Sequence, residues 1–138
     1  MVDDGGRKII LPTAGIGMDD LEQRYKNICL KLWGEQQGNE IHSWIIDNRP
    51  PHFQRKLMEV MVPIWEMEKV DLKTKILCCI SAFTSHGRSE VEFFLKMAYA
   101  HKIPKSEVEE ILLLVGLEFG FPNAEMTIGV LQEVYDIQ

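Results

Sequence analysis

The sequence lacks an apolar run of the roughly 18 residues that a membrane-spanning helix requires. Its first residues, MVDDGGRKIILPTAG, also lack the long apolar stretch behind a basic end that marks a secretory signal peptide. We therefore expect a cytoplasmic protein without a membrane partner.

Cysteine is scarce, with only Cys29, Cys78 and Cys79 in the chain. An odd number that includes two neighbours is a poor basis for a disulfide framework, so buried, reduced thiols are expected. The chain also lacks an H-x-x-x-H pattern, a His/Cys cluster and a Gly-rich nucleotide-binding loop. We expect no metal ion and no bound nucleotide.

Positively charged residues are outnumbered: the chain has 15 Lys and Arg residues and 21 Asp and Glu residues, and its formal net charge is −6. Two helix-sized segments joined by a short turn near residue 103 invite comparison with a helix-turn-helix. However, Glu107, Glu109 and Glu110 stand where a recognition helix would meet DNA phosphates, and they would repel them. We expect no nucleic-acid partner.

The remaining composition is that of an ordinary globular protein, with 46% hydrophobic and 26% charged residues. A length of 138 residues suits one domain with a core of its own. The Gly-rich segment 1–17 shows no sustained periodicity and is predicted to be a flexible N-terminal arm. A single domain is predicted to follow at 18–138.

Apolar residues recur with helical spacing in the first half of this domain. Asp19 or Asp20 is predicted to cap a first helix, and Gly34 is predicted to end it. A second, shorter helix ends before Pro50–Pro51, where a third begins. Pro63 is expected to kink this third helix or to end it early.

The second half also has helical spacing. Asp71 is predicted to cap an apolar helix that stops near Gly87. The next two helices open with the same letters, Ser89 to Glu92 and Ser106 to Glu109, which match the capping-box pattern. A last helix is predicted at about 122–135. No segment alternates like a half-buried strand, so the prediction is an all-α bundle of about six to seven helices.

Four segments carry a resemblance to a known family: YKNICLKLWGE (25–35), PHFQRKLMEVMVPIW (51–65), WEMEKVDLKTKIL (65–77) and SHGRSEVEFFLKMAYAHKIPKSEVEEILLLVGLEFGFP (85–122). Their order, spacing and lengths resemble the carboxymuconolactone decarboxylases, a family that includes the alkylhydroperoxidases. The resemblance implies a helical protomer that assembles into a trimer or a hexamer, with pockets near the subunit contacts. It implies decarboxylase chemistry without metal or organic cofactor, or peroxidase chemistry by a Cys-x-x-Cys pair with a nearby Glu and His.

The chain departs from the family pattern at several positions. RSEVEF follows Gly87, where the peroxidases place their Cys-x-x-Cys pair. The family's core histidine falls on Phe94, its acidic residue ahead of the tryptophan on Pro63, and its tyrosine before GFP on Glu118. A thiol-dependent alkylhydroperoxidase is therefore the least favoured function.

Three polar residues are candidates for chemistry. His86 would act as an acid or base near neutral pH, or it is a helix-terminal histidine favoured by the helix dipole. Arg88 would clamp a substrate carboxylate, or it pairs with Glu90 or Glu92. Glu118 interrupts the apolar run ILLLVGLEFGF. It would face a pocket as an acid or base, or it emerges at the exposed end of its helix.

Phe94 and Trp65 are predicted to wall the pocket, and Glu59 is predicted to replace the missing acid or to lie on a solvated helix face. The resulting prediction is an enzyme that acts on a small carboxylated or cyclic organic molecule by cofactor-free acid–base chemistry. The reaction would be of the decarboxylase, lyase or isomerase type. The alternative is a non-catalytic oligomeric member of the family with a binding or structural role.

Overall fold

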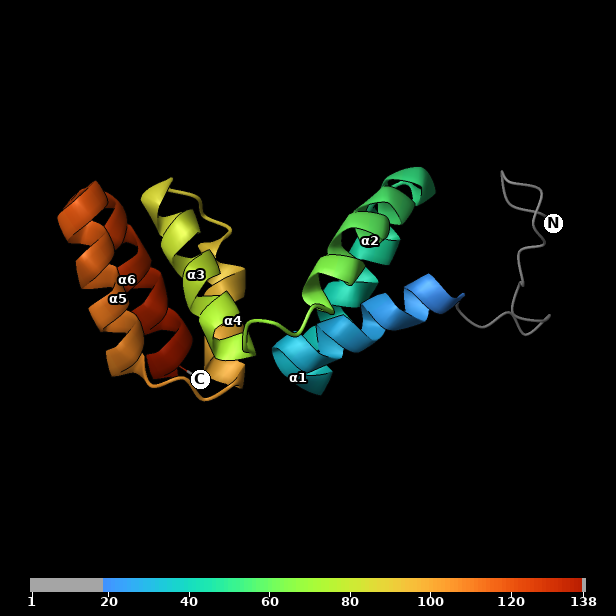
Figure 1. Cartoon of the computed structure of the whole chain (residues 1–138), viewed down its shortest axis with the longest axis horizontal. Coiled ribbons are helices and arrows are strands. Elements are labelled where there is room, and N and C mark those ends of the chain that lie inside the picture. Colours follow the sequence, from blue (N-terminus) through green and yellow to red (C-terminus); the bar gives the residue numbers. More distant parts are fainter. Residues whose placement is uncertain (1–18, 138) are drawn as a thin grey trace. The chain divides into compact units, whose positions relative to one another are not determined.

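The computed structural model describes residues 19–137, and within that range it contains six helices and no strand (Figure 1). The all-α prediction is confirmed at this level. The predicted arm at 1–17 lies outside the described residues. The helices are α1 (Asp20–Asn48), α2 (Pro51–Trp65), α3 (Leu72–Ser85), α4 (Val91–Ala100), α5 (Lys105–Phe119) and α6 (Phe121–Ile137).

The chain divides into two compact units, an N-terminal unit that ends at Met67 and a C-terminal unit that starts at Glu68. The N-terminal unit holds α1 and α2, and the C-terminal unit holds α3 to α6. The single domain predicted for 18–138 stays a prediction.

In the N-terminal unit, α1 is two helical segments joined by a sharp bend at Gly34, where φ is 85° and ψ is 175°. A φ in the left-handed region favours glycine, so the predicted end of the first helix at Gly34 is confirmed. Asp19 caps α1 by accepting a hydrogen bond from the backbone N–H of Glu22. The bend folds the second segment back onto the first, because Gly38 lies against the backbone of Cys29.

Helix α2 begins at Pro51, as predicted, and packs on α1 through the buried side chains of Met58 and Val62. Pro63 lies inside α2, which continues only to Trp65. The helix thus continues for two residues beyond Pro63, so Pro63 does not end it at that point. Tyr25, Ile28, Cys29, Leu32 and Trp33 are the buried residues that α1 adds to this core.

In the C-terminal unit, α3, α5 and α6 lie side by side and α4 packs on α3 and α6 (Figure 1). Asp71 caps α3 by accepting from the backbone N–H of Thr74, as predicted. The core is apolar except for Thr84 and Thr127, whose hydroxyl oxygens lie 3.0 Å apart. Its largest fully buried side chains are Ile76, Ile80, Val91, Leu95, Met97, Val108, Leu112 and Leu131.

Both predicted capping boxes are wrong. The backbone N–H of Glu92, which the Ser89 side chain would have bound, donates instead to the carbonyl of Ser89, and α4 starts two residues after Ser89. Ser106 lies inside α5, since that helix starts at Lys105 directly after Pro104. Pro104 has the fixed φ that leads into a helix, so α5 starts too early for Ser106 to cap it.

Candidate functional site

Three of the predicted site residues lie at one end of the C-terminal unit. His86 and Arg88 follow the last residue of α3, and Glu118 is in the last turn of α5. The amide of Asn123, at the start of α6, donates to the backbone carbonyl of Ser85 at 3.4 Å. This contact joins the α5–α6 connection to the end of α3. We call this region, residues 85–90 and 118–123, the His86 end.

His86 is the exposed C-terminal cap residue of α3. Its Nδ1 lies 3.0 Å from the carbonyl oxygen of Ala82 and 3.1 Å from the hydroxyl of Ser85. A carbonyl oxygen only accepts, so Nδ1 carries the proton in the first contact. The arrangement satisfies a carbonyl at the end of α3, which is a structural role for the ring.

Arg88 is exposed and pairs with Glu90 through two parallel hydrogen bonds of 3.1 Å and 2.7 Å. The hydrogen bonds to Glu90 raise the pKa of Arg88, and those from Arg88 lower the pKa of Glu90. The planar fork that a substrate carboxylate would need is thus occupied by a carboxylate of the same turn.

Glu118 is exposed, between Leu117 and Phe119, whose side chains are also exposed. The structure places this carboxylate at the solvent-facing end of its helix.

Phe94 is half-buried and stacks on Phe83 with ring centroids 4.8 Å apart, so its ring packs against a neighbouring helix.

The two other predicted residues belong to the N-terminal unit. Trp65 is half-buried at the last position of α2. Glu59 is exposed on α2 and pairs with Lys56 at 3.1 Å and with Arg55 at 3.8 Å. Glu59 therefore belongs to the charged surface of α2.

The cysteines fall into different environments and form no disulfide among the described residues. Cys29 is buried, and burial raises the pKa of its thiol to about 11. Burial and the neighbouring Cys78 raise the pKa of Cys79. Cys78 is exposed, so the expectation that all three are buried is wrong for this residue. A raised pKa disfavours the thiolate that peroxidase chemistry needs.

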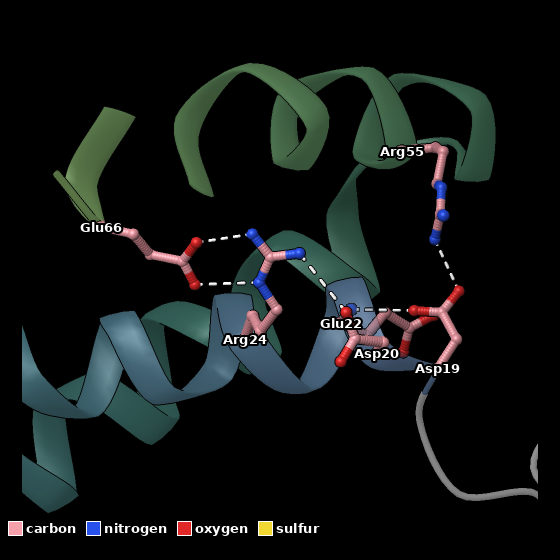
Figure 2. Close-up of polar contacts among 6 residues, drawn as sticks. All are labelled: Asp19, Asp20, Glu22, Arg24, Arg55 and Glu66. Atoms are coloured by element: carbon pink, nitrogen blue, oxygen red, sulfur yellow. Dashed lines mark hydrogen bonds and ion pairs between the residues drawn. The ribbon is translucent and has the colours of Figure 1, made fainter. Parts of the chain in front are cut away.

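Ion pairs join the two helices of the N-terminal unit (Figure 2). Arg24 binds the carboxylate of Glu66 through Nε and Nη2, and its Nη1 lies 3.3 Å from Asp20. Arg55 of α2 pairs with Asp19, the residue that caps α1. These groups are largely exposed, so the network aligns the helices and adds little stability.

The sequence predictions missed an exposed apolar surface on α5. Leu113, Leu114 and Leu117 are 62%, 54% and 70% exposed, and helix geometry makes them neighbours. The half-exposed ring of Phe121 lies against Gly116, which is one helical turn after Leu113 and directly before Leu117 in the chain. We call these four side chains (Leu113, Leu114, Leu117, Phe121) the α5 ridge. The signal was present in ILLLVGLEF, because α5 is apolar on the core side and on the opposite side.

Within residues 19–137, no three His, Cys, Asp or Glu side chains converge in a way that could hold a metal ion. No described helix is both long and apolar enough to cross a membrane. Comparison with protein-family models, with curated proteins and with solved structures gives no match for this chain. The resemblance to the carboxymuconolactone decarboxylases therefore stays a prediction.

Proposed function

We propose that this chain is a non-catalytic helical binding protein that self-associates through the α5 ridge. The observation that carries the proposal is the exposure of Leu113, Leu114 and Leu117 on the side of α5 opposite the core. Residues 111–117 of α5 are all apolar, and a helical stretch that is apolar all round is normally covered on every side. Large contiguous apolar patches on a soluble protein mark interaction surfaces.

The size of the ridge fits a reversible association. Each of its four side chains is more than half exposed, so covering it contributes on the order of 1–2 kcal/mol. Self-association covers the ridge of each of two copies, so together these side chains contribute about 8–16 kcal/mol, which exceeds the lower estimates, of about 4 kcal/mol, for the lost freedom of two associating molecules. The ridge can therefore drive association, and neighbouring exposed groups such as Phe119 add to it.

The occupant that we propose is another copy of the chain. The resemblance to the carboxymuconolactone decarboxylases supports this choice, since it implies an assembly of three or six subunits. The three displaced family positions at Pro63, Phe94 and Glu118 support a non-catalytic role. So do the exposure of Glu118 and the pairing of Arg88 with Glu90.

Light scattering coupled to size-exclusion chromatography tests the proposal. The wild-type chain should elute as a trimer or hexamer at micromolar concentration. Leu117→Lys should shift it to the monomer, because an ammonium in the centre of the interface would be desolvated without a partner. Ser106→Lys is the matched control, since it adds the same charge at an exposed polar position of α5 and should leave the assembly intact.

A monomeric wild-type chain at high concentration would contradict the proposal. So would a Leu117→Lys variant that assembles like the wild type. Far-ultraviolet circular dichroism of each variant checks that the helices are retained, so that dissociation is not confused with unfolding.

A second function, the predicted enzyme, is supported by one observation: His86, Arg88 and Glu118 share the His86 end. Glu118 lies one helical turn after Leu114 on the same side of α5, so an association over the α5 ridge would also remove water from around this carboxylate. His86 and Glu118 would exchange protons and Arg88 would hold an anionic group of a small carboxylated or cyclic substrate. Phe94, which lies in the same unit, would wall the site.

The enzyme proposal is tested with the assembled protein on a panel of small lactones and carboxylic acids. Loss of a general acid or base lowers the rate by about 10²–10⁴-fold. The double variant His86→Ala/Glu118→Gln should therefore lose almost all turnover of any substrate that is found. Full turnover in that variant would reject catalysis by these residues, and turnover by the wild type would reject the non-catalytic proposal.

A further inference from the structure

The fold-back of α1 half-buries His42, a histidine that the proposed function does not use. The bend at Gly34 places the second segment of α1 on the first, with Gly38 against the backbone of Cys29. One helical turn beyond Gly38, the ring of His42 packs on the ring of Tyr25. Their centroids are 5.7 Å apart and their planes are tilted by 40°. His42 therefore lies in the contact that holds the two segments together.

The Nε2 atom of His42 is buried and has no hydrogen-bond partner among the described residues. In a neutral imidazole Nε2 can be the unprotonated nitrogen, so the ring has no N–H donor at this buried position. An imidazolium carries an N–H at Nε2, and this buried donor would have no acceptor. Burial lowers the pKa of His42, and the nearby positive charge of Lys26 lowers it further. Both effects favour the neutral ring in the folded protein.

The groups around His42 do not offer a compensating negative charge. On the first segment of α1, Tyr25 hydrogen-bonds with Cys29, and burial raises the pKa of both side chains, so both are neutral near pH 7. On α2, the carboxylate of Glu59 pairs with Lys56 and Arg55, and that of Glu66 pairs with Arg24. The charged group that acts on His42 is Lys26, which is repulsive toward an imidazolium.

We propose that His42 makes the fold-back of α1 an acid-sensitive joint, in which protonation of the ring releases the second segment of α1 from Tyr25. The direction of the pH dependence follows from the linkage between proton binding and folding. Because the folded-state pKa lies below the unfolded value of about 6.5, the contribution of neutral His42 is complete above about pH 6.5. It is lost as the pH falls from there through the folded-state pKa.

Thiol labelling of Cys29 reads the opening of this joint, because the side chain is 0% exposed in the closed state. The full chain with Cys78→Ser and Cys79→Ala leaves Cys29 as the single thiol. Its labelling rate is measured between pH 8 and pH 5 and divided by the rate in the unfolded chain at the same pH. Protection should fall by up to about tenfold per pH unit below pH 6.5, the limit for one proton.

The same measurement on His42→Phe should show protection that does not change in this pH range, since Phe keeps a ring on Tyr25 and cannot be protonated. His52→Gln is the control, because His52 is exposed and its replacement should leave the pH dependence unchanged. An unchanged pH dependence in His42→Phe would overturn the proposal. If this variant does not fold, nuclear magnetic resonance titration of His42 decides: a pKa below 6.5 supports the joint, and a pKa at or above 6.5 rejects it.

Discussion

At the scale of single residues, the pair of buried threonines in the C-terminal unit is the polar contact most enclosed by core. Thr84 on α3 and Thr127 on α6 are both fully buried, and their hydroxyls lie 3.0 Å apart. Each hydroxyl is thereby spared the cost of a buried polar group without a partner. The pair therefore fixes the position of α6 against α3 while the surrounding packing stays apolar.

Thr84→Val should lower the free energy of unfolding by about 1–3 kcal/mol, because the Thr127 hydroxyl would remain buried without its partner. The double variant Thr84→Val/Thr127→Val should cost less than the single variant, since both polar groups are then replaced by methyl groups of the same shape. Urea unfolding of the two variants measures the difference. Costs that simply add up would show that the two hydroxyls do not depend on each other.

The candidate site residues show what single positions in a sequence can predict. The sequence indicated correctly that His86 and Arg88 lie where α3 ends, because the apolar spacing stops at Gly87. It left open whether Glu118 is buried or exposed. That question depends on which side of α5 faces the core, and the apolar residues on both sides of this helix gave no answer.

At the scale of helices, two glycines differ in the space that a side chain would find at their positions. A Cβ at Gly38 would lie 2.5 Å from the backbone carbonyl oxygen of Cys29, so the two segments of α1 approach too closely for any side chain. A Cβ at Gly129 on α6 would have no neighbour within 4 Å. The first glycine is required by packing, whereas the second only lowers the helix propensity of α6.

Gly38→Ala should therefore destabilise the protein by about 1–3 kcal/mol through overpacking against backbone. Gly129→Ala should stabilise it by about 0.5–1 kcal/mol, because alanine is the better helix former. The two changes are chemically the same and alter the unfolded chain alike, so each is the control of the other. Thermal and urea unfolding measure both, and destabilisation of the same size in both variants would contradict this account.

Helix ends show where local sequence rules hold and where they fail. Asp19 and Asp71 cap α1 and α3 as predicted, since each carboxylate is followed by backbone N–H groups that nothing else binds. Ser89 and Ser106 match the pattern equally well by sequence. They fail because a backbone turn at 88–92 and the early start after Pro104 had already positioned those N–H groups.

At the scale of the whole molecule, the chain consists of two units that each have a buried core. The predicted site drew Trp65 and Glu59 from one unit and His86, Arg88, Phe94 and Glu118 from the other. The structure brings His86, Arg88 and Glu118 to one end of the C-terminal unit. Spacing along the chain could not show this, because more than 25 residues separate the two parts of the His86 end.

The sequence by itself determined the all-α class, the bend at Gly34, the start of α2 at Pro51 and the caps at Asp19 and Asp71. These features depend on periodicity, backbone preferences and hydrogen bonds within a few residues, so neighbouring residues in the sequence are enough to determine them. Only the tertiary structure decided that α5 exposes a second apolar side, that Glu118 faces solvent and that His42 packs on Tyr25 with its Nε2 atom buried. Burial is a property of distant segments that pack together, and no local rule contains it.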